Sequence, residues 1–315
     1  MPKNIILFGV PRSGTTWISE VLTAHNKVKL IHEPDNEFNS FPGLIFKNGL
    51  SRFPYLDKKA DNKDFYTLFD YALNKTIPSQ AGLINKLLFK IYGLQRSKLK
   101  QELLKNGTAI KEKPLFSEKI LNILTTKCEK RKLIKSVHAL LTVPYLLNHF
   151  DFFPLIVTRN PLNVFSSYKK INMPDANRNL YKQTRLLNDY DINIEKGIND
   201  QNKDYEAGVQ LAIFDLVLKQ NIKKYPQIVH VHYEDILKDP YEAFKRLHKK
   251  LSLDYNEQTE NFIKSRFKAG DGYATYRIPE KQLEAWKSRL NDTEIRDFTN
   301  GYQMATREKA FIFDE

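Results

Sequence analysis

The sequence predicts an α/β fold in which a central parallel β-sheet is flanked by helices. Short, nearly continuous apolar runs alternate along the chain with segments of helical periodicity, a pattern typical of parallel strands that are buried on both faces. The loop Gly9–Trp17, GVPRSGTTW, directly follows the first apolar run, so the sheet is expected to be P-loop-like. A content of 41% hydrophobic and 28% charged residues agrees with a folded globular chain.

The expected elements follow one another in this alternating order. Strands are expected at residues 4–10, 28–34, 108–114, 131–137, 153–161 and 227–235. Helices are expected at residues 13–25, 117–127, 143–150, 162–170 and 205–225. Because no linker or internal repeat interrupts the pattern, we expect one domain over residues 1–315.

Residues 38–106 break the alternation and are expected to form a helical insertion. Within this insertion, residues 81–94, AGLINKLLFKIYGL, are expected to form a basic amphipathic helix. Three roles are open for this helix: it touches a membrane surface, it covers a substrate, or it packs against the sheet.

Charge and cysteine content restrict the partners and the compartment. A formal net charge of +13 favours anionic ligands such as nucleotides, acidic saccharides, nucleic acids or membrane surfaces. The single cysteine, Cys128, excludes an internal disulfide framework and a cysteine-rich metal site. The sequence shows neither a signal-peptide pattern nor a run of about 18 apolar residues, so we expect a cytoplasmic protein.

The loop after the first strand has the pattern of a nucleotide-phosphate loop without its lysine. The pattern G-x-x-x-x-G-K-[ST] fits Gly9, Gly14 and Thr16 but requires lysine where the chain has Thr15. Backbone N–H groups and a helix N-terminus bind a phosphate without that lysine, and Arg12 adds a fixed cation. The loop therefore predicts an anion-binding site.

A second anion site is predicted where the segment VTRNPLNVFSSYKK passes from strand to helix. Arg159 ends the strand, Pro161 suits the first helical turn, and Ser166 and Ser167 follow about two turns later. A ligand with a single phosphate does not need two such sites. The two motifs together therefore predict a ligand that carries phosphate groups at both ends.

Glu33 follows the second expected strand, and we expect it next in the sheet to the loop that carries Arg12. A carboxylate that faces an anion site is costly unless it removes a proton from a substrate, which makes Glu33 a candidate general base. The other interpretation is a salt bridge from Glu33 to Arg12 or Lys135. Without the other motifs, the position of Glu33 favours the salt bridge over a role as general base.

Together these motifs resemble the sulfotransferases that use 3′-phosphoadenosine 5′-phosphosulfate (PAPS), and the resemblance extends over about residues 4–290. It is closest to the bacterial carbohydrate and tyrosylprotein branches, which have arginine in the loop and glutamate after the second strand. The resemblance implies a PAPS site with Arg12, Ser13, Gly14, Thr15 and Thr16 at the 5′ end, Trp17 and Tyr233 at the adenine, Arg159 and Ser167 at the 3′-phosphate, and Lys268 and Arg277 in a C-terminal loop.

The resemblance also implies the chemistry. Glu33 would remove the proton of the acceptor, and Arg12 and Lys135 would stabilise the transferring and leaving oxygens. The product nucleotide would be 3′-phosphoadenosine 5′-phosphate (PAP), and no metal would be required. Lys111 competes with Lys135 for the lysine role, because its Lys-x-x-Pro pattern also occurs near such sites. The fallback bases are His32 and His138.

The acceptor is expected to be a hydroxyl group, or else an amine, of a saccharide, a glycoconjugate or a small natural product. The helical insertion at residues 38–106 is expected on the acceptor side of the protein, and residues 171–200 are expected to shape the acceptor site with it. Two other classes of protein remain open at this point. A P-loop kinase would require Mg²⁺ and a metal-binding aspartate at a strand end. A basic protein that binds nucleic acid or a membrane would account for the charge and the amphipathic helix. We expect no nucleic-acid partner, since no recognition motif is present, and the sequence leaves the oligomeric state open.

Overall fold

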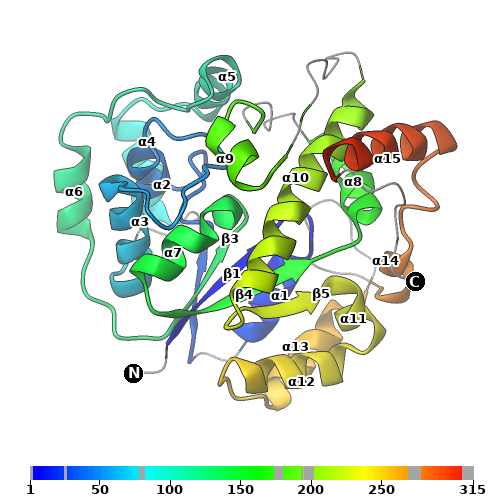
Figure 1. Ribbon diagram of the computed structural model, residues 1–315. Coiled ribbons are helices and arrows are strands. Elements are labelled where there is room, and N and C mark those ends of the chain that lie inside the picture. Colours follow the sequence, from blue (N-terminus) through cyan, green and yellow to red (C-terminus); the bar gives the residue numbers. More distant parts are fainter. Residues whose placement is uncertain are drawn as a thin grey trace. The chain divides into compact units, whose positions relative to one another are not determined.

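The computed structural model describes residues 3–24, 27–77, 82–173, 180–192, 194, 202–268 and 278–306. These residues contain five strands: β1 (Asn4–Gly9), β2 (Lys29–His32), β3 (Lys132–Ser136), β4 (Phe152–Thr158) and β5 (Val229–His232). The strands form a parallel sheet in the order β2-β3-β1-β4-β5, flanked by helices (Figure 1). The predicted α/β class is confirmed.

The chain divides into two compact units. The first comprises Met1–Phe8 and Asn26–Pro154, and the second comprises Gly9–His25 and Leu155–Glu315. The phosphate loop and the motif around Arg159 therefore belong to the second unit, whereas Glu33 and Lys135 belong to the first. Each unit thus holds one group of the predicted site residues.

In the first unit, β3 lies between β2 and β1. Ile5 of β1 and Leu30 of β2 both pair with Leu133 of β3, and Ile5–Phe8 are fully buried, as their continuous apolar pattern predicts. The expectation that Glu33 lies next in the sheet to the loop after β1 is wrong. After β2 the chain crosses over through the helical insertion and returns as β3, which takes that place.

The helices of the first unit are α2 (Phe41–Phe46), α3 (Lys63–Asn74), α4 (Leu83–Ile91), α5 (Arg96–Asn106), α6 (Ser117–Leu124), a 3₁₀ turn (Ala139–Thr142) and α7 (Val143–His149). The four from α2 to α5 fall within residues 38–106, in agreement with the predicted helical insertion. The strand expected at residues 108–114 is wrong, because this segment consists of bends and loop. Its apolar part is only two residues long, and Pro114 cannot donate a ladder hydrogen bond.

The helices of the second unit are α1 (Thr15–Leu22), α8 (Pro161–Lys170), α9 (Thr184–Asp189), α10 (Lys203–Lys224), α11 (Tyr233–Lys238), α12 (Pro240–Lys250), α13 (Glu257–Arg266), α14 (Glu280–Leu283) and α15 (Asp292–Thr306). Strand β4 pairs with β5 in the register Leu155 to Val229. Phe165 of α8 stacks on Phe298 of α15, with ring centroids 4.5 Å apart. Helix α8, which carries Ser167, is thereby held against α15.

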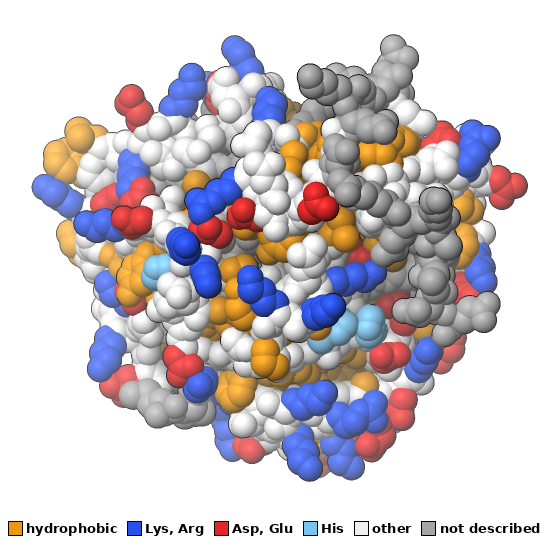
Figure 2. All heavy atoms as spheres, in the orientation of Figure 1, with side chains coloured by type: hydrophobic (Ala, Val, Ile, Leu, Met, Phe, Trp, Pro, Cys, Tyr) orange, Lys and Arg blue, Asp and Glu red, His pale blue; other side chains and the backbone are white. Residues whose placement is uncertain are grey.

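The surface carries its positive charge in a dispersed form on the face drawn in Figure 2. Lys and Arg side chains on this face are spread among Asp and Glu side chains rather than gathered in one continuous patch. Within the part of the chain that the structure describes, no helix has both the length and the apolar character needed to cross a membrane.

Candidate active site

The phosphate loop connects the end of β1 to the start of α1. Gly14 is the N-cap residue of α1 and has a left-handed backbone, with φ at 92°. The N–H of Ser13 donates a hydrogen bond to the carbonyl oxygen of Val10 at 3.0 Å. A Cβ atom at Gly14 would lie 2.2 Å from Cε2 of Tyr233, so both the backbone angle and the contact require glycine here.

Four residues that the sequence assigns to the cofactor form one cluster in the second unit. Nε of Arg12 donates to Oγ of Ser167 at 2.9 Å, and Nη1 of Arg159 donates to the backbone oxygen of Arg12 at 2.9 Å. The guanidinium of Arg159 lies over the ring of Tyr233, 4.8 Å from its centroid. We call these residues the arginine cluster; two guanidinium groups and a hydroxyl are donors that suit phosphate or sulfonate oxygens.

The ends of β4 and α8 position this cluster. Strand β4 ends at Thr158, directly before Arg159, and α8 begins with Pro161. The side chain of Asn160 caps α8 by accepting two backbone N–H bonds of its first turn. Ser167 follows two turns later and is buried, so the predicted strand-to-helix junction is present with its spacing intact.

Two buried polar atoms of the loop and of α1 have no hydrogen-bond partner among the described residues. They are Oγ of Ser13 and Nε1 of Trp17. Buried polar groups in proteins are normally hydrogen-bonded, so these atoms fit a site that a polar ligand completes. The indole of Trp17 is edge-on to the rings of Tyr233 and Phe244, at centroid distances of 6.0 and 5.2 Å.

The C-terminal loop that the resemblance assigns to the 3′-phosphate is described only in part. Lys268 is exposed just beyond the end of α13, and Arg277 lies outside the described residues. Helix α13 is attached to α1 by an ion pair between Nη2 of Arg266 and Oε2 of Glu20, 3.3 Å apart. Lys268 thus lies two residues beyond the end of a helix that is ion-paired to α1, and its role stays a prediction.

In the first unit, Glu33 and Lys135 form a buried ion pair. The backbone N–H of Glu33 donates to the carbonyl oxygen of Lys135 at 2.7 Å, and Nζ of Lys135 donates to Oε1 of Glu33. Nδ2 of Asn36 donates to the other carboxylate oxygen at 2.8 Å. Glu33 has a left-handed backbone, with φ at 42°, a conformation that is rare for this residue type and concentrated at functional sites. The structure therefore contains the salt bridge to Lys135 that the sequence left open.

This ion pair controls the acidity of Glu33. Burial alone would raise the pKa of Glu33, but the positive charge of Lys135, the charge of His32 and the hydrogen bonds from Lys135 and Asn36 lower it to about 2. The carboxylate is therefore charged at neutral pH. It is also a weak base for as long as Lys135 holds it.

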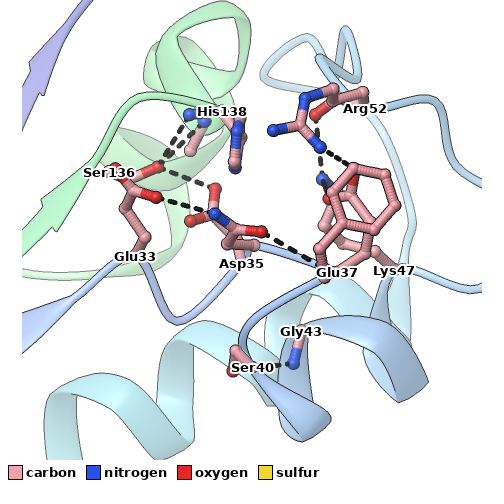
Figure 3. A network of polar contacts seen from close by, with 12 residues as sticks. Glu33, Asp35, Glu37, Ser40, Gly43, Lys47, Arg52, Ser136 and His138 are labelled. Carbon is pink, nitrogen blue, oxygen red and sulfur yellow. Dashed lines mark hydrogen bonds and ion pairs between the residues drawn. The ribbon is translucent and has the colours of Figure 1, made fainter. Parts of the chain in front are cut away.

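Asp35 is a second buried carboxylate, which the sequence analysis missed (Figure 3). Its Oδ2 accepts a hydrogen bond from Oγ of Ser136 at 2.7 Å, and its Oδ1 has no partner among the described residues. Burial and the nearby charge of Glu33 raise the pKa of Asp35 to about 6, although Lys47 and Ser136 act in the opposite direction. Asp35 therefore exchanges a proton much closer to neutral pH than an exposed aspartate does.

Glu37 completes this row of acids and is neutralised by two cations. Its carboxylate forms ion pairs with Nζ of Lys47 at 2.9 Å and with Nη1 of Arg52 at 2.7 Å (Figure 3). Burial would raise the pKa of Glu37, but these two charges lower it. The segment HEPDNEF has an acidic residue at every second position. This pattern is the signal in the sequence that indicates the row of acids.

The remaining candidates from the sequence lie in different settings. Lys111 is exposed in the loop before α6, whereas Lys135 is buried against Glu33. His138 is buried, and burial lowers its pKa well below the ordinary value, so its ring is neutral at neutral pH. His32 is the last residue of β2 and is partly buried.

Comparisons with known proteins identify the family. A family model described as "Sulfotransferase family" matches residues 2–257. A search of curated proteins found no match.

Three solved structures show how distant the similarity is. Mouse sulfotransferase SULT7A1, complexed with PAP, is 14% identical over 98% of this chain and 86% of that chain, with a TM-score of 0.44. The sulfotransferase domain from the curacin biosynthetic pathway is 14% identical over 94% and 96%, with a TM-score of 0.46. Sulfotransferase STF1 from Mycobacterium tuberculosis is 14% identical over 90% and 77%, with a TM-score of 0.38.

The family match extends over most of the chain, from the first strand to the beginning of α13. It confirms the resemblance that the phosphate loop and the motif around Arg159 indicate. The interpretations as a P-loop kinase and as a non-enzymatic binding protein are set aside. The chain belongs to the sulfotransferase family, whose enzymes transfer a sulfuryl group from PAPS to an acceptor.

Proposed function

We propose that this sulfotransferase transfers the sulfuryl group of PAPS to a hydroxyl group of a saccharide, a glycoconjugate or a small natural product, with Glu33 as the general base. The observation that carries the proposal is the arginine cluster, in which Arg12, Arg159, Ser167 and Tyr233 contact one another. Its two cations and its hydroxyl suit a nucleotide that carries several anionic groups. PAP is then the product nucleotide.

The proposed cofactor site lies in the second unit. The 5′-phosphosulfate is assigned to Arg12, Ser13, Gly14, Thr15 and Thr16, because this loop leads into the N-terminus of α1 and contains the buried Oγ of Ser13 that has no partner among the described residues. The 3′-phosphate is assigned to Arg159 and Ser167, with Lys268 and Arg277 from the C-terminal loop. The adenine is assigned to Trp17 and Tyr233, whose rings already pack edge-on.

The proposed reaction moves a sulfuryl group in line between two oxygens. The acceptor oxygen forms a bond to sulfur while the bond from sulfur to the 5′-phosphate oxygen breaks, and PAP leaves with that electron pair. The proton of the acceptor hydroxyl passes to the carboxylate of Glu33. Arg12 and Lys135 neutralise the charge on the transferring and leaving oxygens, which is the main contribution that a protein makes to this type of transfer.

Glu33 becomes an effective base in this scheme only when Lys135 leaves it. With a pKa of about 2, the paired carboxylate takes up a proton poorly. A sulfonate or phosphate that reaches Lys135 would compete with Glu33 for its ammonium. Once the ammonium turns to that anion, the burial of Glu33 is opposed only by the charge of His32 and the hydrogen bond from Asn36, so its pKa rises. Binding of the donor would thereby activate the base, while Asn36 keeps the carboxylate oriented.

We assign the acceptor site to residues 38–106 and 171–200. In the second segment, residues 174–179, 193 and 195–200 lie outside the described part of the chain. The resemblance to the bacterial carbohydrate branch favours a saccharide hydroxyl. An amine is disfavoured because it is protonated near neutral pH and has no free electron pair until it loses that proton. We propose a cytoplasmic location, since a chain with a single cysteine suits a reducing compartment.

The test is transfer of labelled sulfate from PAPS to pools of saccharide and small-molecule acceptors. We expect Glu33→Gln to lower turnover by about 10²–10⁴-fold, the usual contribution of a general base, without loss of PAP affinity. Asp35→Asn in the same loop is the matched control and should retain most of the turnover. Near wild-type turnover by a folded Glu33→Gln protein would disprove the base assignment. A larger loss in Asp35→Asn than in Glu33→Gln would move that role to Asp35.

A further inference from the structure

Helix α4 in the first unit is anchored by its inner face. Oδ1 of Asn85 accepts the backbone N–H of Phe41 at 2.8 Å, and Nδ2 of Asn85 donates to the carbonyl oxygen of Asn39 at 2.8 Å. The ring of Phe89 packs edge-on against that of Phe41, with centroids 5.8 Å apart. Asn85, Leu88 and Phe89 are buried, so packing on α2 accounts for this side of the helix.

The outer face of α4 is apolar as well, and it is exposed. Leu83, Leu87 and Ile91 repeat every four residues, and their side chains are 81%, 50% and 63% exposed; Ile84 beside them is 47% exposed. Residues four apart lie one above the other on a helix, so these side chains form one stripe. Nothing in the inner packing of the helix requires apolar residues at these positions.

A neighbouring turn extends this apolar surface. The hydroxyl of Tyr92, which follows α4, donates to the carbonyl oxygen of Leu115 at 3.1 Å. Leu115 is 76% exposed and Phe116 is 59% exposed. The backbone of Phe116 is left-handed, with φ at 59°. The ammonium of Lys119 lies 5.4 Å from the centroid of the Phe116 ring. We define the α4 face as Leu83, Ile84, Leu87, Ile91, Leu115 and Phe116.

The charge around the α4 face is strongly positive. Lys86 and Lys90 lie on α4 itself and are exposed. Along residues 83–119, which include Leu115 and Phe116, the basic side chains are Lys86, Lys90, Arg96, Lys98, Lys100, Lys105, Lys111, Lys113 and Lys119, against three acidic side chains, Glu102, Glu112 and Glu118. Exposed apolar side chains with lysines beside them are typical of helices that lie in the interface of an anionic bilayer.

We propose that the α4 face docks on the surface of an anionic lipid bilayer, with its apolar side chains at the headgroup level and the neighbouring lysines on the lipid phosphates. A second copy of the chain would bring two strongly basic segments together, and like charges repel. A nucleic acid would meet the lysines but would leave the leucines and isoleucines in water. A bilayer with acidic headgroups satisfies both features. This inference goes beyond the proposed sulfuryl transfer and does not depend on it.

The test is co-sedimentation of the full chain with vesicles of phosphatidylcholine, with and without phosphatidylserine. We expect the protein to sediment with the phosphatidylserine vesicles and to be released by high salt. The variants Leu87→Ser/Ile91→Ser and Lys86→Glu/Lys90→Glu should each weaken this binding by about tenfold or more. The matched controls lie on α12, where Tyr241→Ser removes a partly exposed ring and Lys249→Glu/Lys250→Glu reverses two exposed lysines; both should bind like the wild type.

Three results would overturn the proposal. In the first, the α12 controls lose as much binding as the α4 variants, so that the attraction depends only on overall charge. In the second, neutral and acidic vesicles sediment the protein equally. In the third, the wild type forms a dimer that Leu87→Ser/Ile91→Ser converts to a monomer, which would assign the α4 face to a second copy. Circular dichroism of each variant checks that it is folded.

Discussion

The arginine cluster and the row of acids in the first unit neutralise their charges in different ways. Arg12 donates to a serine hydroxyl, and Arg159 contacts a backbone carbonyl, the face of Tyr233 and, at 4.0 Å, the carboxylate of Glu234. In the row of acids, by contrast, two buried carboxylates form close ion pairs. Glu33 is paired with Lys135, and Glu37 is paired with Lys47 and Arg52.

This difference shows what each region can do without rearrangement. The hydrogen bonds of both guanidinium groups described above are to neutral atoms, and the carboxylate of Glu234 lies 4.0 Å from Arg159, an arrangement that suits the proposed anion site. Carboxylates that are held by buried cations are stable but inactive, because an ion pair has to open before a proton can move. Under the proposed function, the protein would combine a preformed anion site with a general base, Glu33, that has to be released from Lys135.

The largest expected effect tests whether the row of acids depends on its internal pairing. Lys135→Met should lower the free energy of unfolding by about 3 kcal/mol or more, because it leaves the buried carboxylate of Glu33 without its cation. Adding Glu33→Gln to this variant should recover much of the loss, since the uncompensated charge is then gone. Urea unfolding of the single and double variants measures both effects.

The matched control for this prediction is Lys113→Met in the same unit. Lys113 also pairs with two acids, Asp64 and Glu118, but this network is partly exposed. Lys113→Met should therefore lower the free energy of unfolding by no more than about 1 kcal/mol. If Lys135→Met and Lys113→Met lose the same free energy of unfolding, burial of the pair between Glu33 and Lys135 does not make it more important for stability than an exposed pair.

The second effect tests the readiness of the arginine cluster. Arg159→Ala should weaken PAP binding by about 100-fold, or about 2.7 kcal/mol, because it removes a charged donor and releases the carbonyl of Arg12. Titration calorimetry with PAP measures this change. Arg246→Ala, which removes an exposed arginine on α12, should bind PAP like the wild type. If both variants lose affinity equally, PAP responds to net charge and not to the cluster.

The third prediction concerns Asp35 and the pH dependence of stability. The native pKa of about 6 lies above the ordinary value of 3.8, so the folded protein retains a proton that the unfolded chain releases. Asp35 therefore stabilises the fold fully below pH 3.8, and this contribution is lost as the pH rises towards 6, by at most about 1.4 kcal/mol per pH unit. Asp35→Asn should remove this decline, which denaturation at several pH values would detect. Asp61→Asn, at an exposed position, should keep it; an unchanged decline in Asp35→Asn would contradict the assignment.

The sequence was sufficient for features that depend on short-range spacing. The glycines of the phosphate loop, the strand end before Arg159 and the position of Ser167 two turns into a helix are local patterns with a fixed geometry, and the structure contains all three. The buried run Ile5–Phe8 follows equally from local composition. Such features need no knowledge of the neighbouring strand.

The features that the sequence did not predict depend on tertiary partners. The place of β3 between β2 and β1 depends on where the chain returns after a long insertion, which no local pattern encodes. The pairing of Glu37 with Lys47 and Arg52 was missed for the same reason, since lysine and arginine in a loop usually face water. The wrong strand at residues 108–114 reflects an apolar run too short to separate a strand from a loop.

The contact between Gly14 and Tyr233 has a consequence for the affinity of the ligand proposed for the second unit. The ring of Tyr233 packs against the backbone at Gly14, and the same ring lies under the guanidinium of Arg159. The loop therefore cannot relax without disturbing an aromatic side chain that α11 carries. The conformational entropy of ordering the loop is lost when the protein folds rather than when the ligand arrives, so that more of the interaction energy remains as affinity.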